Sequence, residues 1–208
     1  MNILLIGASG MIGSRILNEA VSRGHSVIAA SRHPDKIAKK ANVQAVQLDA
    51  TDAKALTAIA AKADVIVSSV SPRGGGDPIA EAKAVGDAVI AAARATGKRL
   101  FVVGGAGSLN LPDGSPLAEK LPDAYRGEAL GMRGVLNSLK SSTVDWTFFS
   151  PPAIISPGER TEKYRLGTTT LLSDAKGESR ISAEDYSHAV VAELESHAHP
   201  RQQMTIAY

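Results

Sequence analysis

The chain of 208 residues contains no cysteine, and this absence removes several kinds of chemistry at once. Disulfides, thiolate metal sites and cysteine nucleophiles are all excluded. The sequence also has no block of like charge, because 23 Lys and Arg stand against 21 Asp and Glu, for a formal net charge of +2. That near balance gives no reason to expect a nucleic-acid partner.

A long apolar run is missing as well. The first apolar segment, Asn2–Ile6, gives way to glycine at Gly7 after only a few residues. It is too short for the core of a signal peptide and far too short to span a bilayer. We therefore expect a cytoplasmic protein that is not associated with a membrane.

What the sequence does contain is an alternation of short apolar runs with helical patterns. This alternation is typical of βαβ units and predicts an α/β fold with a mostly parallel sheet, in one domain over residues 1–208. The predicted strands cover residues 2–6, 26–30, 43–48, 64–70, 99–103, 145–149 and 203–207, with short strands near 165–172. The predicted helices cover residues 10–24, 34–40, 53–61, 77–97, 125–139 and 183–195, and residues 104–122 are predicted to form a long loop.

Three glycines at Gly7, Gly10 and Gly13 follow the first strand directly and open an amphipathic helix. The first glycine permits a tight turn, the second lets the backbone approach a pyrophosphate, and the third lets the helix pack on the strand. The free N–H groups of the helix N-terminus suit the phosphates. This context favours a dinucleotide-binding turn over a glycine turn that binds nothing.

The end of the second strand indicates which dinucleotide is bound. NAD sites usually carry Asp or Glu there, whereas this chain has Ser31 and Arg32, with Lys36 one helical turn later. The Arg32 guanidinium suits a ribose 2′-phosphate, so NADP(H) is favoured over NAD(H). The alternative is that Arg32 and Lys36 belong to a solvated basic face.

Ligands of open α/β sheets lie outside the carboxyl ends of the strands, so the ends of the later strands are expected to flank the same ligand. Asp49 is placed to accept from the adenine amino group, and its alternative is an ordinary capping aspartate. The cofactor-binding residues predicted in this way are Gly7, Ala8, Ser9, Gly10, Met11, Ile12, Gly13, Ser31, Arg32, Lys36, Asp49, Ala50, Ser69, Val70, Gly104 and Gly105.

Five further segments carry a resemblance to one family, namely FVVGGAGSL at 101–109, DWTFFSPP at 145–152, PGERT at 157–161, YRLG at 164–167 and RISAEDY at 180–186. With the glycine turn, they resemble the atypical short-chain dehydrogenase/reductases. Within these, the chain is most similar to the small bacterial NAD(P)H-binding proteins labelled NADH-flavin reductases, relatives of biliverdin-IXβ (flavin) reductase and of NmrA-like proteins. The resemblance covers essentially the whole chain.

The resemblance implies a doubly wound Rossmann-type sheet of seven or eight strands, with a small C-terminal substrate region over about residues 151–208. It implies hydride transfer from NADPH to a planar acceptor such as a quinone or a flavin, with FMN or FAD as the substrate. A basic residue after the second strand binds the 2′-phosphate in the flavin reductase relatives, which matches Arg32. Pro151, Pro152 and Ala153 are implied to lie near the nicotinamide.

The sequence departs from related enzymes at two points. Ordinary short-chain dehydrogenases use Tyr-x-x-x-Lys to move a proton, but no tyrosine of this chain has Lys four residues on, and Tyr125 is followed by Ala129. Biliverdin-IXβ reductase carries His after the diproline, where this chain has Ala153. Flavin reduction tolerates both departures, because hydride transfer to a flavin needs positioning more than a protein acid.

Ser108 and Tyr125 are the candidate catalytic residues. Ser108 would donate a hydrogen bond to the acceptor, and Tyr125 would line its pocket. A plain loop serine and a tyrosine that packs against the loop are the alternatives. His197 and His199 lack a carboxylate cluster, so no metal site is predicted.

The leading hypothesis is therefore an NADPH-dependent reductase of a small planar acceptor, acting as a monomer or homodimer. The alternative from a different class is a non-catalytic NADP(H)-binding redox sensor of NmrA-like type that acts through a protein partner. A nucleotide-sugar epimerase is disfavoured by the missing Tyr-x-x-x-Lys.

Overall fold

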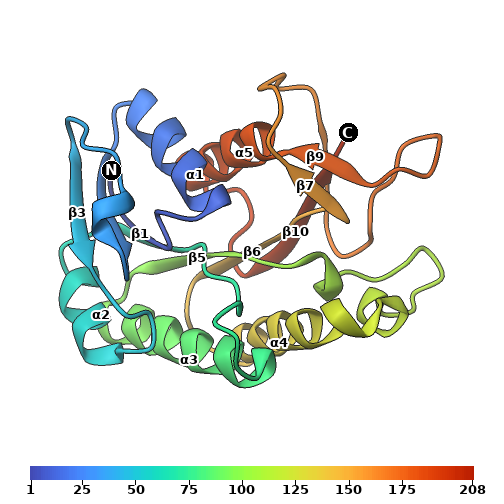
Figure 1. Cartoon of the computed structure of the whole chain (residues 1–208), viewed down its shortest axis with the longest axis horizontal. Helices are drawn as coiled ribbons and strands as arrows, with labels where there is room; N and C mark the ends of the chain where they lie inside the picture. Colours follow the sequence, from blue (N-terminus) through green and yellow to red (C-terminus); the bar gives the residue numbers. More distant parts are fainter.

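A computed structural model describes all of residues 1–208, which form ten strands and five α-helices (Figure 1). The strands are β1 (Asn2–Ile6), β2 (Ser26–Ser31), β3 (Val43–Gln47), β4 (Val65–Ser68), β5 (Arg99–Val103), β6 (Trp146–Ser150), β7 (Ile154–Ser156), β8 (Arg165–Gly167), β9 (Arg180–Ser182) and β10 (Gln202–Ala207). The helices are α1 (Met11–Ser22), α2 (Ala53–Ala60), α3 (Pro78–Thr96), α4 (Asp123–Lys140) and α5 (Ala183–Ser196).

Eight of the strands form one sheet in the order β3-β2-β1-β4-β5-β6-β10-β8. Every neighbouring pair in it is parallel except β10 and β8, which are antiparallel. The chain winds outward from β1 in one direction and then from β4 in the other, which is the doubly wound order of a Rossmann fold. The predicted α/β class and the predicted sheet of seven or eight strands are confirmed.

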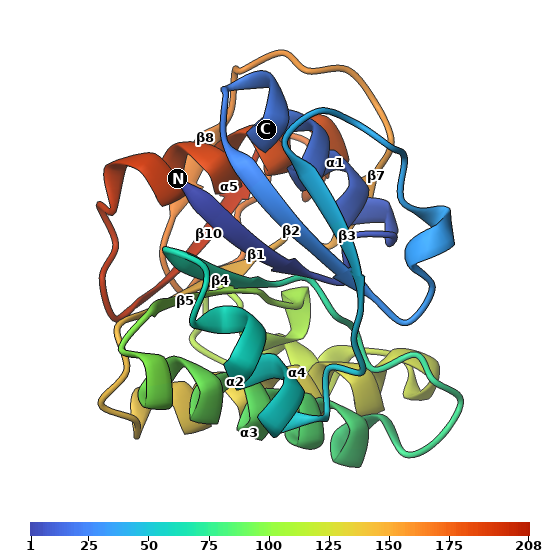
Figure 2. The ribbon, with the colours of Figure 1, turned by 90° about the vertical axis from the view of Figure 1, so that its left-hand side faces the viewer.

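Helices cover both faces of the sheet. In Figure 1, α1 and α5 lie on one face, and α2, α3 and α4 lie on the other. Figure 2 gives the same two layers from the side, with β1, β2 and β3 running between them. Each layer encloses its own apolar cluster: Leu4 and Ile6 of β1 belong to the α2–α4 side, and Ile3 and Leu5 belong to the α1–α5 side. Because alternate side chains of a strand point to opposite faces, a strand covered on both faces needs an unbroken apolar run.

Capping residues account for most of the helix starts. The Asp52 side chain accepts hydrogen bonds from the backbone N–H groups of Lys54 and Ala55, and α2 begins there as predicted. Asp77 caps α3, with Pro78 at the first helical position. These side chains satisfy N–H groups that have no partner within the helix.

The prediction of a helix over residues 34–40 is wrong. Only Pro34–Lys36 form a single 3₁₀ turn, and the backbone is extended at Ile37, with φ −88° and ψ 124°. Ile37 is 6% exposed and packs in the α1–α5 core. The extended backbone at Ile37 lets its side chain pack in this core, so the helical turn does not continue beyond Lys36.

The loop predicted over residues 104–122 contains two 3₁₀ turns, at Ala106–Ser108 and Leu117–Lys120. It pairs with a segment far away in the sequence, since the Asn110 N–H donates to the Thr169 oxygen and the Leu171 N–H donates to the Asn110 oxygen. The short strands expected near 165–172 are reduced to β8. The pair β7–β9, which forms a separate small sheet, was not predicted.

Candidate functional site

A cavity of about 460 Å³ lies at the carboxyl ends of β1, β2, β3 and β4. This is the point where the winding of the sheet reverses, between β1 and β4, and ligands of open α/β sheets bind at such points. Among the predicted cofactor-binding residues, those lining the cavity are Gly7, Ser9, Gly10, Ser31, Arg32, Asp49, Ala50, Ser69 and Val70. Those that do not line it are Ala8, Met11, Ile12, Gly13, Lys36, Gly104, Gly105, Pro151, Pro152 and Ala153.

The glycine turn after β1 is built by two glycines that the fold itself requires. Gly7 has φ +83°, and a Cβ on it would lie 2.5 Å from the Ser69 oxygen. A Cβ on Gly13 would lie 2.1 Å from the Gly7 oxygen, so the first turn of α1 rests directly on the turn. A side chain on Gly13 would push α1 away from the turn, and one on Gly7 would collide with the backbone that follows β4 and would strain its positive φ.

Gly10, in contrast, is not required by packing within the protein. A Cβ on Gly10 would meet only the Gly7 oxygen, at 3.3 Å, and the space in front of it belongs to the cavity. The next three backbone N–H groups, those of Met11, Ile12 and Gly13, have no hydrogen-bond partner in the protein, and no side chain caps the helix. Unpaired N–H groups at the positive end of a helix, beside an open approach, fit a diphosphate.

Ser9 and Ser31 tie this turn to the end of β2. Their hydroxyl oxygens lie 2.7 Å apart, and the Ser31 oxygen also accepts the His33 N–H at 3.1 Å. The Ser31 side chain is therefore engaged in holding the two segments together, and it leaves the next side chain, Arg32, at the cavity wall.

Arg32 is exposed and makes no hydrogen bond or ion pair with the protein. Every other arginine of the chain except Arg94 donates to a side-chain or backbone oxygen. An unpaired guanidinium at a cavity wall is free to pair with an anionic ligand. Lys36 is also exposed and unpaired, but it lies outside the cavity lining.

Asp49 lies across from Arg32 at the end of β3. One of its oxygens accepts both the N–H and the hydroxyl of Thr51, at 2.9 and 2.7 Å. These hydrogen bonds, with a smaller effect from the Arg32 charge, hold the pKa of Asp49 below its ordinary value. The carboxylate is therefore ionised at neutral pH, and its second oxygen has no partner in the protein.

Sequence reasoning missed the floor and one wall of the cavity. Val85 and Val89 of α3, with Met132 and Val135 of α4, form an apolar floor. The wall is formed by Ser71, Pro72, Gly74 and Glu81. The floor residues give the same sequence signal as ordinary core positions, whereas the glycines at 74–76 mark an unusual backbone between β4 and α3.

Ser108 is buried, with 4% of its surface exposed, and its hydroxyl is engaged within the protein. It donates to the Gly105 oxygen at 2.6 Å and lies 2.8 Å from the Ser150 hydroxyl. The Gln203 amide donates to the Ser108 backbone oxygen at 3.2 Å and to the Ser150 hydroxyl at 3.0 Å. This cluster joins the loop after β5 to β6 and β10. Tyr125 is 63% exposed on the first turn of α4, and neither it nor Ser108 lines the cavity.

The ends of β5 and β6 lie at the same edge of the sheet, beyond the cavity. A Cβ on Gly104 would lie 2.2 Å from the Phe148 ring, so packing alone requires this glycine. Pro151 and Pro152 are buried, whereas Ala153 is exposed and donates its N–H to the Ser179 hydroxyl at 3.2 Å.

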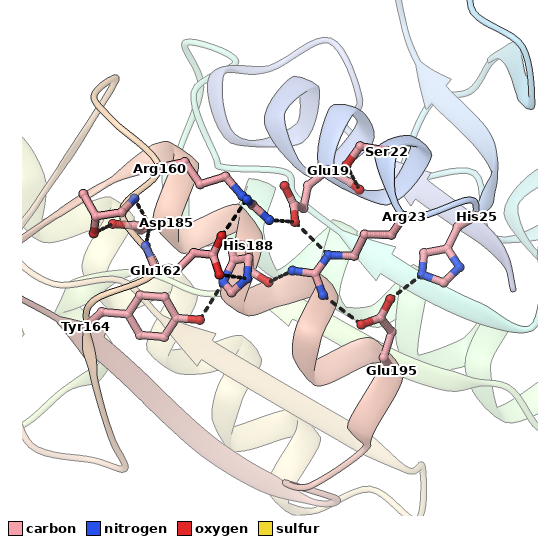
Figure 3. A network of polar contacts seen from close by, with 11 residues as sticks. Glu19, Ser22, Arg23, His25, Arg160, Glu162, Tyr164, Asp185, His188 and Glu195 are labelled. Carbon is pink, nitrogen blue, oxygen red and sulfur yellow. Dashed lines mark hydrogen bonds and ion pairs between the residues drawn. The ribbon is translucent and has the colours of Figure 1, made fainter.

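A polar network fixes the segment that follows, residues 157–164, onto α1 and α5 (Figure 3). Arg160 donates to Glu19 at 2.9 Å and to Glu162 at 2.7 Å. Glu19 also accepts from Arg23 at 2.7 Å, and Arg23 donates onward to Glu195 of α5 at 2.8 Å. The C-terminal region is thereby tied to the helix whose N-terminus faces the cavity.

Two carboxylates anchor this network. Burial opposes the ionisation of Glu19, but the hydrogen bonds from Arg160 and Arg23 outweigh it and hold the pKa of Glu19 below its ordinary value. Burial likewise opposes the ionisation of Asp185, and hydrogen bonds from Thr161, Glu162 and Tyr208 hold its pKa below its ordinary value. No group of three or more His, Asp or Glu side chains is arranged to hold a metal ion, in this network or outside it.

Comparison with known proteins identifies the family. A family model described as NAD(P)H-binding matches residues 7–197. The chain belongs to this NAD(P)H-binding family. The protein YwnB of Bacillus subtilis (strain 168), described as uncharacterized, is 35% identical over 214 residues, with 99% of this chain and 98% of YwnB covered.

Two solved structures share the fold along essentially the whole chain. A Burkholderia pseudomallei protein, provisionally described as exported, is 44% identical with a TM-score of 0.89, and both chains are covered completely. A Streptococcus pneumoniae protein, provisionally described as an NADH-flavin reductase, is 28% identical with a TM-score of 0.84, covering 100% of this chain and 99% of that one. The family model confirms the expected NAD(P)H-binding protein, and the relative from Streptococcus pneumoniae carries the flavin reductase description that the sequence resemblance names.

None of the helices combines the length and the apolar character needed to cross a bilayer. The cytoplasmic location, the absence of a nucleic-acid partner and the monomeric or homodimeric state stay predictions.

Proposed function

We propose that this member of the NAD(P)H-binding family is an NADPH-preferring reductase that transfers a hydride to a flavin, a quinone or a similar planar acceptor. The observation that carries the proposal is Arg32, whose guanidinium is exposed, unpaired and at the cavity wall. No carboxylate stands at the end of β2 to accept from a ribose 2′-hydroxyl, so the chemistry at that position suits a 2′-phosphate.

Different residues of the cavity bind different parts of the dinucleotide. Gly10 leaves room for the diphosphate, and the N–H groups that follow it donate to the phosphate oxygens. Arg32 pairs with the 2′-phosphate, and Lys36 adds a second, looser positive charge. The free oxygen of Asp49 accepts from the adenine amino group, and Val85 and Val89 provide an apolar floor.

When bound, the reduced nicotinamide supplies the hydride. The acceptor gains two electrons and one proton in that step and takes its second proton from solvent, so the balance requires no protein acid. Gly104 and Gly105, with the segment Pro151–Ala153, border the space at the ends of β5 and β6 where acceptor and nicotinamide meet. Their task is to position the two rings and to exclude other reactions. The relative from Streptococcus pneumoniae, with its flavin reductase description, supports this class of acceptor.

The test is a steady-state assay of NADPH and NADH oxidation with FMN, FAD and a simple benzoquinone as acceptors. We expect turnover with at least one acceptor. We also expect kcat/KM for NADPH to exceed that for NADH by about ten- to a hundredfold, the value of one charge-assisted hydrogen bond. No oxidation above background with any acceptor would exclude the reductase, and equal efficiencies would exclude the role of Arg32.

A second function is favoured by the engagement of Ser108. Its hydroxyl is occupied within the protein, and neither it nor Tyr125 lines the cavity, so neither candidate catalytic residue is placed to act on an acceptor there. A redox sensor would bind NADP(H) tightly without turnover and would bind a protein partner with different affinities in the two redox states. Equal partner affinity with NADP⁺ and NADPH would remove that mechanism, because only differential binding shifts an equilibrium.

A further inference from the structure

The segment between β4 and α3 forms one wall of the cavity. Ser71, Pro72 and Gly74 line it, and Glu81 lines it from the first turns of α3. A carboxylate beside a site for a polyanionic dinucleotide needs an explanation, since its charge opposes that of the ligand.

Glu81 uses both of its oxygens on this segment. One oxygen accepts the Gly74 N–H at 2.8 Å, and the other accepts the Gly76 N–H at 2.9 Å. Hydrogen bonds from N–H groups to an ionised carboxylate are among the strongest that a protein makes. The negative charge of Glu81 is therefore directed at the N–H groups of the loop. The positive end of the α3 dipole offsets part of the repulsion between this charge and the ligand.

The glycines of the loop fit this arrangement. A Cβ on either Gly74 or Gly76 would lie 2.9 Å from a Glu81 oxygen, so a side chain there would displace the carboxylate from its present position. Gly75, between them, has φ +91°, which glycine adopts without strain. The backbone thus wraps around one carboxylate, and each glycine removes an obstacle to the wrapping.

The other link of the loop to the protein is weaker. Arg73 donates to both oxygens of Glu128 on α4 at 3.2 Å, but its side chain is 72% exposed. Exposed ion pairs contribute little to stability. Pro72 is buried at the start of the segment, and Glu81 is the principal anchor of the exposed residues 74–76.

We propose that Glu81 is a positioning residue for the dinucleotide, which holds the segment 71–76 in the conformation that forms the cavity wall. This inference deepens the proposed function and rests on the cavity being the dinucleotide site, but it does not depend on a preference for NADPH. Without the anchor, the wall is formed in only a fraction of molecules, and the apparent affinity falls by that fraction. The loss is the same for both cofactors, because they share the part of the ligand that the wall contacts.

The experiment compares Glu81→Ala and Glu81→Gln with the wild-type chain, and Arg73→Ala is the matched control on the same loop. Calorimetric titration with NADPH and with NADH gives the affinities, and hydrogen exchange at residues 74–76 reports the order of the wall. We expect Glu81→Ala to weaken both cofactors by an equal factor of about ten, as a wall formed in one molecule in ten requires. Exchange at 74–76 should become faster, with the melting temperature and kcat at saturating cofactor unchanged. Glu81→Gln keeps one acceptor oxygen, so its cofactor affinities should lie between those of Glu81→Ala and of the wild-type chain. The cofactor affinities of Arg73→Ala should stay within about twofold of the wild-type values.

Wild-type affinity for both cofactors in Glu81→Ala would overturn the proposal. A loss of affinity with unchanged exchange would overturn it too, because Glu81 would then contact the ligand directly. If Glu81→Ala fails to fold, Glu81→Gln gives the same comparison. Equal wild-type affinities for NADPH and NADH would contradict the cofactor preference alone, whereas no binding of either would remove both proposals.

Discussion

The carbonyl oxygen of Gly7 occupies the space that a Cβ on Gly13 would need, at a separation of 2.1 Å. Gly10 lies between them in the sequence, yet a Cβ there would meet nothing closer than 3.3 Å. Three glycines with one spacing therefore serve two purposes: the outer pair lets the helix sit on the strand, and the middle one leaves room for a ligand.

Alanine substitutions separate these purposes. We expect Gly13→Ala to lower the free energy of unfolding by about 2 kcal/mol or more, because the overlap with Gly7 must be relieved by moving the helix. Gly10→Ala should cost less than about 1 kcal/mol, the scale of a change at a helix cap. It should nevertheless weaken cofactor binding, because the new methyl group enters the cavity. Urea unfolding and calorimetric titration measure the two effects, and wild-type binding by Gly10→Ala would show that the ligand does not approach there.

Arg32 provides a test of cofactor choice. Arg32→Ala should weaken NADPH by about ten- to a hundredfold, since it removes a charge-assisted hydrogen bond to the 2′-phosphate. The affinity for NADH should stay unchanged, because NADH has no phosphate at that position. Lys36→Ala serves as the control for general charge, and it should weaken NADPH by only a few fold. Equal losses for the two cofactors in Arg32→Ala would place the phosphate elsewhere.

The role of Ser108 can be determined by measuring the stability and the turnover of Ser108→Ala separately. Its hydroxyl lies within hydrogen-bond distance of Gly105 and Ser150, so Ser108→Ala should cost about 1–3 kcal/mol of stability by leaving buried partners unsatisfied. Turnover per folded molecule should stay close to wild type. Thermal unfolding and the steady-state assay decide the matter, and a large fall in kcat at unchanged stability would make Ser108 a catalytic residue.

The network around Glu19 predicts a loss of stability in acid. The pKa values of Glu19, Asp185 and Glu195 are all lower in the folded protein than the ordinary values of 4.5, 3.8 and 4.5. A carboxylate with a depressed folded pKa contributes stability that is present above its unfolded pKa and is lost as the pH falls through its folded pKa. The free energy of unfolding should therefore decrease as the pH drops below about 4.5.

Glu19→Gln identifies the contribution of this one carboxylate. The variant should lose about 2 kcal/mol at neutral pH, where hydrogen bonds from two arginines are weakened. Its free energy of unfolding should then depend less steeply on acid than that of the wild-type chain. Urea unfolding across a series of pH values measures both quantities, and parallel profiles for the two proteins would contradict the assignment.

The sequence was sufficient for the features that depend on neighbouring residues. The glycine turn and the basic residue after β2 are set by local spacing, and both are found where the sequence predicts them. Ile37 was misplaced because its burial against the α1–α5 core outweighs the helical pattern around it. β7 and β9 were missed because strands of three residues are too short to establish a period of two.

Contacts between distant residues account for the remaining differences. The Ser108 hydroxyl is occupied by a cluster whose third member, Gln203, lies 95 residues away in the sequence. The cavity floor comes from Val85 and Met132, which sit on different helices and carry only the pattern of core positions. Neither fact can be read from spacing, because each depends on how α3, α4 and β10 pack.

The position of β10 has a consequence for the order in which the site is assembled. Gln203 lies in this strand, which is inserted between β6 and β8, and its amide joins the loop after β5 to the end of β6. During synthesis, the half of the sheet that surrounds the diphosphate turn emerges from the ribosome long before Gln203. The cavity can therefore form early, because all of its lining residues precede β10 in the chain, while the neighbouring loop gains its final brace only after β10 has entered the sheet.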